Sequence, residues 1–412
     1  MARTEAPAVA AFSRAPAAAD RFDRLEVAVH ADIAPLEMDW RALAAAEGVT
    51  VYQSFDWVAA WLDAAAPAQA IRPAIVTLYD EGRLVMIWPL GIERIGPFRI
   101  ARPLGGEHAN IRMPIVAADW RCEADDAAVD RLLRRIAGTI RGVDLFDFDA
   151  LPLDQDGAPL FLARHSAALP ARCNVGTIRL SGDFAAVLAA HRGAKKTKKH
   201  RWQKNALAPV GGYQLRRAAS RAEADAMLDA FLAEKAAWFR RNGLDDSFAA
   251  PGVVPFFRAL IARRWDDGRE GVIEIDAIEF AGGIHAILGS GTANGRQSGY
   301  FLAITDDEWR RISPGELLIH EVIEAACARG ITLFDLGRGD ERYKASWLDR
   351  TETHVRLIRP VTLLGHAAAL AIALRDRAEK TIRDDERLWS LVGRFRKRRG
   401  EARTVEQPAA ED

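Results

Sequence analysis

The stretch Leu333-Phe-Asp-Leu-Gly-Arg-Gly-Asp-Glu-Arg-Tyr-Lys344 carries the clearest structural signal in this chain. It begins as a short apolar run, and at Gly337 it changes into a loop with a second glycine at 339. Apolar runs that stop at glycine are typical of buried strands. The stretch therefore predicts a buried strand whose end carries side chains of both charge signs, namely Arg338, Asp340, Glu341, Tyr343 and Lys344.

A helix with clear boundaries directly precedes this strand. Ser313 stands at the N-cap, Pro314 occupies the first helical position and Gly330 follows the helix end. Proline is tolerated in the first turn because its missing N–H would be unpaired there anyway, and glycine commonly ends helices. The sequence therefore predicts a helix that starts at Pro314 and leads into the strand.

Three strand-like runs come before this helix, at 272–280, 284–291 and 297–304. Gly282-Gly283 and Asn294-Gly295 separate them, and Asn-Gly is a strong signal for a two-residue hairpin turn. These runs predict an antiparallel meander. A similar meander is predicted between residues 72 and 116 in the first half of the chain, where a helix also follows it.

The first half also contains a copy of the strand signal. Arg141-Gly-Val-Asp-Leu-Phe-Asp-Phe148 and Arg329-Gly-Ile-Thr-Leu-Phe-Asp-Leu336 are identical at five of eight positions. Any helix that ends at glycine before a buried strand shows a related pattern, but here the order of meander, helix and strand repeats as well, which favours duplication. The first copy continues as Asp149-Ala-Leu-Pro152, without the charged loop, so chemistry is expected only in the second copy.

Composition narrows the class of protein. The 412 residues suffice for two to three domains, and 57 basic residues balance 57 acidic ones. A neutral chain argues against extensive nucleic-acid binding, so no DNA partner is expected. Cys122, Cys173 and Cys327 show no metal-ligand spacing. We therefore predict no metal site and a reducing, cytoplasmic compartment.

We divide the chain into four parts. Residues 1–20 are expected to be a disordered leader, residues 21–170 and 171–360 the two similar domains, and residues 361–412 a helical, basic tail. The apolar segment 361–374 is shorter than the roughly 20 residues that a membrane-spanning helix needs. The tail is a candidate for peripheral membrane contact.

The densest charge run of the chain, residues 192–204, opens the second half and includes Lys195 and Lys198. Its seven Lys or Arg residues and one Trp suit a surface for a polyanionic ligand. A solvated helix face beside the site explains the same pattern, and both interpretations stay open.

With these parts in place, residues 184–347 resemble the GNAT-like acetyltransferase family typified by the cellulose-biosynthesis protein CelD, which is related to the FemABX aminoacyltransferases. The resemblance lies in the order and spacing of the basic run Lys195–Arg201, a helix with Trp238, Ser313-Pro-Gly315 and Phe334–Lys344. It implies an α/β (α+β) fold, a tandem duplication of a GNAT-like fold with mixed, mostly antiparallel sheets flanked by helices. Residues 21–170 would be the degenerate copy and 171–360 the catalytic one.

The resemblance also implies an activity. Acetyl-CoA or another acyl-CoA would donate an acyl group to an amine or hydroxyl of a small molecule or of a polysaccharide or cell-envelope precursor. In GNAT folds the donor's pyrophosphate lies at a helix N-terminus, where unpaired N–H groups and the helix dipole favour an anion. The corresponding residues here are Arg310, Arg311, Ser313 and Gly315.

The loop at this helix differs from the usual GNAT pattern Arg/Gln-x-x-Gly-x-Gly/Ala, since it has a single glycine and a proline. Two alternatives therefore remain beside the acyl-CoA transferase. One is a FemABX-like transferase that uses aminoacyl-tRNA. The other is a non-catalytic scaffold protein of an envelope polysaccharide complex.

Direct attack on a thioester requires a base for the acceptor, a group that polarises the carbonyl and an acid for the departing thiolate. We predict Asp340 or Glu341 as the base, Tyr343 as the acid or an acceptor ligand, and Lys344 as a cation that opposes a phosphate or the developing oxyanion. Substrate contacts are further predicted for Arg338, Tyr300, His285, Lys195 and Lys198. For His285 a hydrogen-bonded position in the core is the alternative.

Overall fold

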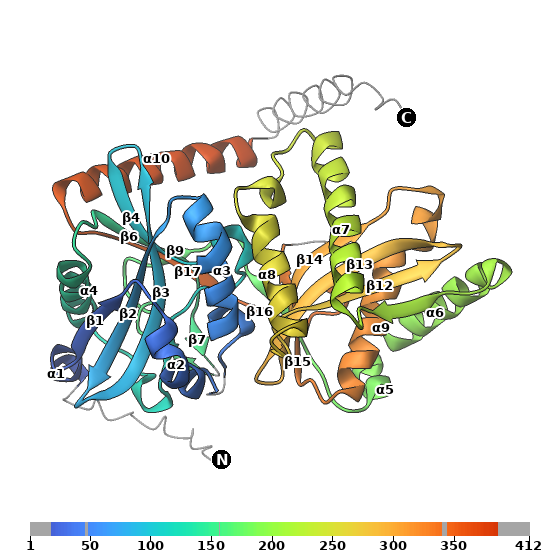
Figure 1. Ribbon diagram of the computed structural model, residues 1–412, viewed down its shortest axis with the longest axis horizontal. Helices are drawn as coiled ribbons and strands as arrows, with labels where there is room; N and C mark the ends of the chain where they lie inside the picture. The colour runs from blue at the N-terminus through green and yellow to red at the C-terminus, as the bar shows by residue number, and fades with distance from the viewer. Residues whose placement is uncertain (1–17, 46–47, 156, 340–343, 386–412) are drawn as a thin grey trace, which may run out of the picture.

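The computed structural model describes residues 18–45, 48–155, 157–339 and 344–385. They form two α/β units side by side, each built around its own sheet (Figure 1). The first sheet contains β1 (Glu26–His30), β2 (Arg72–Asp80), β3 (Arg83–Ile95), β4 (Phe98–Pro103), β5 (Ile115–Val116), β6 (Leu145–Pro152), β9 (Leu169–Pro170) and β17 (His354–Pro360). The second contains β10 (Val175–Arg179), β11 (Gln214–Arg217), β12 (Glu274–Phe280), β13 (Gly283–Ala293), β14 (Arg296–Ile304), β15 (Leu333–Arg338) and β16 (Arg350–Glu352). A small separate pair is formed by β7 (Asp154–Gln155) and β8 (Ala158–Pro159).

The helices cover these sheets and join the two units. In the first unit they are α1 (Ala18–Asp23), α2 (Glu37–Ala44), α3 (Phe55–Ala68) and α4 (Asp126–Ile140). In the second unit they are α5 (Phe184–Ala190), α6 (Gly193–Leu207), α7 (Arg221–Arg241), α8 (Val253–Trp265) and α9 (Pro314–Ala328). The last described helix, α10 (Leu363–Asp384), returns to the first unit, where it contacts β4, β6 and β17.

The two sheets repeat one strand order. The first runs β1-β2-β3-β4-β6-β17-β9 and the second β11-β12-β13-β14-β15-β10-β16. In each, the fourth and fifth strands are parallel and the other described neighbours are antiparallel, so β4 with β6 corresponds to β14 with β15. The two similar octapeptides lead into β6 and β15. The expected tandem duplication of a mixed, mostly antiparallel α/β fold is thus confirmed.

One strand differs from our division of the chain. We assigned residues 171–360 to the second domain, but β17 lies in the first sheet between β6 and β9. Conversely, β10 takes the equivalent place beside β15 in the second sheet. Residue alternation identifies a strand but not the sheet that it joins, because the partner is set by tertiary packing. The two units are therefore interlocked by the chain that passes between them.

Aromatic packing joins α3 of the first unit to α8 of the second. Trp57 and Trp61 stack on each other on α3, and the ring of Phe256 on α8 lies 5.0 Å from Trp57 and 5.1 Å from Trp61, measured between ring centroids. All three side chains are fully buried. Aromatic side chains of this size contribute large buried areas, so we expect the two units to unfold together.

His354, the first residue of β17, makes the fold sensitive to acid. Its side chain is fully buried, and neither ring nitrogen has a hydrogen-bond partner among the described residues. Burial lowers the pKa of this imidazole to about 4. The folded state therefore holds His354 neutral at pH values where the unfolded chain, with a pKa of about 6.5, takes up a proton.

We expect His354→Phe to flatten the pH dependence of stability. In the wild type this residue's contribution is fully present above pH ~6.5 and falls by about 1.4 kcal/mol per pH unit towards pH ~4. Urea unfolding at neutral and mildly acidic pH measures the difference. The control His366→Phe changes an exposed histidine on α10 and should keep the wild-type pH dependence. Equal slopes for wild type and His354→Phe would contradict the expectation.

Candidate functional site

The second sheet opens between β14 and β15. These parallel strands pair only where Arg296, Gln297 and Ser298 face residues 333–335. On its other edge, β14 has a bulge against β13, because Gly289 pairs with Phe301 and the next residue, Ser290, pairs with Gly299. A bulge bends the strand that contains the extra residue. The bend therefore falls where β14 separates from β15.

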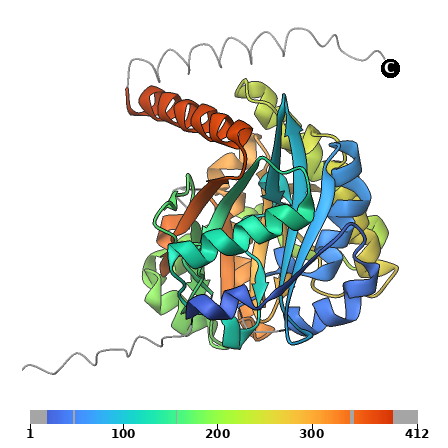
Figure 2. The ribbon, with the colours of Figure 1, turned by 90° about the vertical axis from the view of Figure 1, so that its left-hand side faces the viewer.

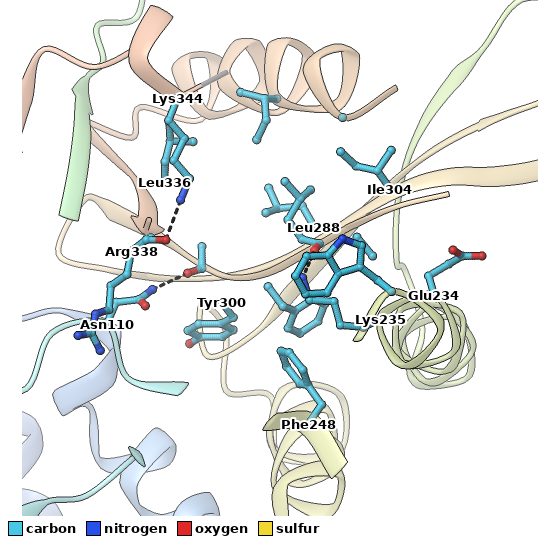
Figure 3. Close-up of a pocket in the computed structure, with 18 of the residues that line it drawn as sticks. Asn110, Glu234, Lys235, Phe248, Leu288, Tyr300, Ile304, Leu336, Arg338 and Lys344 are labelled. Carbon is cyan, nitrogen blue, oxygen red and sulfur yellow. Dashed lines mark hydrogen bonds between the residues drawn. The ribbon is translucent and has the colours of Figure 1, made fainter. Parts of the chain in front are cut away.

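A pocket of about 640 Å³ fills the opening (Figure 3). Its floor is formed by residues 299–304 of β14 and residues 334–338 at the end of β15. The first turn of α9 and Lys344 close one side, and the first unit and α7 contribute the rest. Strand β15 thus ends in this pocket.

The N-terminus of α9 lies at this pocket. Ser313, Gly315 and Arg310 line it, whereas Arg311 does not. Pro314 has no N–H, and the Gly315 amide makes no hydrogen bond to the described residues, so the helix presents a polar N-terminus there. A Cβ at Gly315 would lie 2.3 Å from the Cδ1 atom of Ile304 on β14. Glycine therefore allows close packing of α9 against the strand, and the helix dipole favours an anion at this end.

Lys344 is a buried cation in the pocket wall. Its side chain is 4% exposed, and Nζ donates a hydrogen bond to the Arg338 carbonyl oxygen at 2.8 Å. The Arg338 guanidinium points towards the first unit, with a nitrogen 3.6 Å from the Asp149 carboxylate. Asp340, Glu341 and Tyr343 lie outside the described residues. Their predicted roles stay predictions.

The first unit contributes one wall of the pocket. Asn110 donates hydrogen bonds through Nδ2 to the Tyr52 hydroxyl at 2.7 Å and to the Gly299 carbonyl oxygen at 2.9 Å. The Tyr52 hydroxyl donates to the same carbonyl at 3.1 Å. The two buried side chains thus fix β14 at the point where it leaves β15. Sequence reasoning missed them, because neither residue stands in a pattern that reveals a contact 189 or 247 positions away.

The corresponding opening in the first unit is occupied by its own chain. β4 and β6 pair only at Ile100 and Ala101. Farther along β6, the Ala150 carbonyl oxygen accepts a hydrogen bond from the backbone N–H of Arg112 at 3.0 Å. The segment that carries Asn110 therefore lies beside β6 and reaches over to the second unit. The duplicated fold uses one opening as a pocket and fills the other with a connecting segment.

Aromatic side chains form the remaining wall. Trp238 and Phe239 of α7, Phe248 and the ring of Tyr300 all line the pocket. The Tyr300 hydroxyl points away from it and donates to the Val272 carbonyl oxygen at 2.7 Å. Tyr300 is therefore a ring in the wall rather than a hydrogen-bonding contact for a substrate.

His108 of the first unit lines the pocket next to this aromatic wall. Its ring is 5.0 Å from the ring of Phe248, and burial lowers its pKa to about 4. A neutral imidazole thus faces the pocket at physiological pH. Glu107 beside it and Glu234 on α7 add two carboxylates to the lining.

Three predicted substrate contacts are not in the pocket lining. His285 is held in the core, since Nδ1 lies 2.9 Å from Asp307 and Nε2 lies 3.1 Å from the Phe280 carbonyl oxygen. The alternative considered for this residue is thus the observed one. Lys195 and Lys198 are exposed on α6 and face solvent. The charge run predicted a basic helix, but nothing in it indicated which lysines turn inward.

Lys196 of α6 turns inward. Its Nζ donates to the Ser346 hydroxyl at 2.8 Å and lies 3.8 Å from the centre of the Trp347 ring. Burial lowers the pKa of Lys196 to about 8. Lys196 is not among the residues that line the pocket, so these contacts attach α6 to the segment after Lys344.

One described group has metal-ligand side chains, His200, His320 and Glu321, with their ligand atoms within 4.8 Å of one another. The two imidazole rings stack with centroids 4.0 Å apart and planes at 26°. Since a ring nitrogen binds a metal in the ring plane, stacked rings do not direct their lone pairs to one point. Burial would raise the pKa of Glu321, but contacts with His320, Tyr213 and His200 lower it to about 2. The arrangement suits a hydrogen-bonded carboxylate better than a metal site.

Comparison with known proteins agrees with this geometry. The family model described as "Acetyltransferase (GNAT) domain" matches residues 194–345, which include β14, α9, β15 and Lys344. No curated protein sequence matches the chain. Residues 194–345 are thus similar to the GNAT acetyltransferase domain family.

Solved structures extend the similarity to both units. The crystal structure of FemX aligns with a TM-score of 0.53 and 11% identity over 78% of this chain and 96% of that one. A tandem GNAT protein from the clavulanic acid biosynthesis pathway aligns with a TM-score of 0.44 and 12% identity over 82% and 99% of the two chains. The C-terminal domain of a putative lysylphosphatidylglycerol synthetase from Agrobacterium fabrum aligns with a TM-score of 0.47 and 11% identity over 77% and 96%. The chain thus has a FemX-like fold.

Proposed function

We propose that this protein transfers an acyl group from an acyl-CoA, bound between β14 and β15, to an amine or hydroxyl of an acceptor. The observation that carries the proposal is the opening of the parallel strand pair at the N-terminus of α9. A donor's phosphates would find the Gly315 amide and the positive end of the helix dipole there. The extended pantetheine arm of the donor would lie in the slot between β14 and β15. The unpaired peptide groups of the two strand edges would offer it hydrogen bonds there.

The acyl transfer requires few protein groups. The acceptor forms a bond to the acyl carbon, the carbon–sulfur bond breaks, and the acceptor's proton leaves to a base. Lys344 is positioned to stabilise negative charge on the acyl oxygen from the pocket wall. Asp340 or Glu341 as the base and Tyr343 as the acid complete the proposal.

The pocket lining supports an acceptor with both apolar and polar parts. Trp238 and Phe248 offer ring faces, and Glu107 and Glu234 offer carboxylates. Such a lining suits an amino-bearing small molecule or a sugar precursor, because aromatic faces pack on apolar rings and carboxylates bind ammonium or hydroxyl groups. A polysaccharide or cell-envelope precursor, which the CelD resemblance implies, belongs to this class.

Ile304→Trp is expected to weaken acetyl-CoA binding at least tenfold, roughly 1.4 kcal/mol or more. Ile304 lines the pocket beside Gly315 and is 40% exposed, so an indole there occupies the slot at little cost to the core. Calorimetric titration with acetyl-CoA and with CoA measures the change. Ile95→Trp is the matched control, because Ile95 is a 46% exposed residue at the end of β3 in the first sheet. Wild-type affinity in Ile304→Trp would contradict the proposed donor site.

The exposed face of α6 favours a second candidate, an aminoacyl-tRNA donor. Lys195, Lys198 and Arg201 follow one another at helical spacing, and none has an ionic partner among the described residues. Such a face suits a nucleic-acid backbone. Filter binding of charged tRNA at several salt concentrations separates the candidates. Tight, salt-dependent tRNA binding without acyl-CoA binding would favour the tRNA donor, and binding of neither would favour the scaffold alternative.

A further inference from the structure

Helix α10 exposes an apolar stripe to solvent. Leu363, Leu370 and Leu374 are 90%, 62% and 60% exposed, and Leu364 is 49% exposed. Residues 363, 370 and 374 follow helical spacing, so their side chains share one side of the helix. An exposed row of leucines along the first half of a helix, residues 363–374, exceeds the scattered apolar residues of an ordinary surface and marks an interaction site.

The opposite side of α10 packs on the first unit, and this packing holds the helix with its leucine stripe facing outward. Ala368 is buried against Ile100 and Leu145 of the first sheet. Gly365 packs so closely that a Cβ there would lie 1.8 Å from the Asp144 carbonyl oxygen. Figures 1 and 2 show the helix on the outside of the first unit, with its other side away from the rest of the molecule. The leucines therefore do not serve the fold of the described chain.

Ion pairs hold the second half of α10 in the same orientation. Arg356 of β17 donates to Asp376 at 2.9 Å, and Arg172 pairs with both Asp376 and Glu379. The side chains of Asp376 and Glu379 thus turn inward to partners on the first unit, and Glu379 also accepts a hydrogen bond from Arg375 at 2.8 Å. The basic side chains Arg375, Arg377 and Lys380 are exposed. Because the two carboxylates face the first unit and the basic side chains face solvent, the surface around the end of the leucine stripe is positive.

We propose that α10 docks on an anionic lipid surface, with its leucines at the level of the acyl chains and its basic residues among the head groups. An interfacial helix has this combination of an apolar face and flanking Lys and Arg. No helix among the described residues is long and apolar enough to cross a membrane, so the helix would lie along the surface.

The charge of the sequence after α10 distinguishes two possible occupants of the leucine stripe, a lipid surface and a second copy of this chain. The sequence beyond α10 adds six Lys or Arg and no acidic residue between positions 387 and 399. Two copies joined through their α10 stripes would bring two such basic segments towards each other, which is unfavourable. An anionic lipid surface neutralises them, with about 1 kcal/mol gained for each basic residue near the surface. The same charges therefore disfavour self-association and favour lipid.

Vesicle binding of the full chain tests the proposal. The probe is sedimentation with vesicles of equimolar phosphatidylcholine and phosphatidylglycerol, compared with pure phosphatidylcholine. We expect binding to the anionic vesicles that weakens with salt, and a loss of at least tenfold in the double variant Leu370→Asp/Leu374→Asp. Met38→Asp is the matched control, because Met38 is an 82% exposed apolar residue on α2, and it should bind like the wild type.

Three outcomes would overturn the proposal. The first is no binding of the wild type to anionic vesicles. The second is equal binding of the wild type and the double variant, which would assign the attraction to charge alone. The third is a wild-type dimer that the double variant abolishes, since the occupant of the stripe would then be a second copy. Thermal unfolding of the double variant checks the fold, and because both leucines are exposed we expect an unchanged melting temperature.

Discussion

Replacing Arg296 by methionine is expected to lower the free energy of unfolding by about 3–5 kcal/mol, because it leaves one buried and one half-buried carboxylate without their cation. The guanidinium lies 2.9 Å from Asp335 and 2.9 Å from Glu352, and Asp335 is fully buried. Burial raises the pKa of Glu352, so this carboxylate already bears a desolvation cost that Arg296 offsets. Urea unfolding followed by circular dichroism measures the loss.

The position of Arg296 connects this loss to the pocket. It begins β14 within the short parallel pairing to β15, and its two partners lie on β15 and β16. The ion pairs thus hold three strands together just before β14 and β15 separate. Weakening them should also weaken ligand binding in the pocket.

Two variants test whether buried charge is the cause. Adding Asp335→Asn to Arg296→Met removes one unpaired charge, so the double variant should be more stable than Arg296→Met alone. Arg83→Met removes an arginine whose partner, Asp119, is exposed on the surface, and we expect little change there. A double variant less stable than Arg296→Met would show that the carboxylate is not the source of the loss.

Local signals predicted the second unit well. Pro314 opens α9, Asn294-Gly295 forms the turn between β13 and β14, and residues 333–338 form β15. Each depends on residues close together in sequence, where capping, turn chemistry and periodicity act. The exchange of β10 and β17 between sheets has no such signal, because either strand satisfies the same alternation in either sheet. The sequence therefore predicted the repeat but not its interlocking.

The prediction of the site divides in the same way, between residues indicated by local sequence and residues brought in by long-range packing. Arg338 and Lys344 were predicted from their places at a strand end, and Ser313 and Gly315 from the resemblance to the GNAT family; all four line the pocket. Asn110 reaches the pocket only because two units pack together, which no local pattern records. His285 lies outside the pocket lining, with its ring nitrogens near Asp307 and the Phe280 carbonyl oxygen. Its sequence position on a central strand does not reveal these partners. The prediction of pocket residues from the sequence is therefore limited by long-range packing, which the sequence does not reveal, and not by the chemistry of the residue types.

Lys344→Gln is expected to lower the turnover of acyl transfer roughly 100-fold, the size of effect seen when one preorganised oxyanion contact is removed. The amide retains a donor for the Arg338 carbonyl oxygen, which Lys344 binds at 2.8 Å, but it loses the charge. Thiol release from acetyl-CoA, in the presence of an acceptor found by screening, measures kcat, and calorimetry measures donor binding. We expect the loss in kcat, with donor affinity changed by less than about threefold, because an oxyanion contact strengthens only in the transition state.

A second lysine provides the matched comparison for Lys344→Gln. Lys196 is also partly buried and hydrogen bonded, but its ammonium packs on Trp347 and does not line the pocket. Lys196→Gln should therefore keep kcat close to the wild-type value. A Lys344→Gln variant with normal kcat and weakened acetyl-CoA binding would instead place the ammonium against the donor's phosphates. Equal loss of kcat in both lysine variants would mean that the local structure, rather than the charge in the pocket, had been changed.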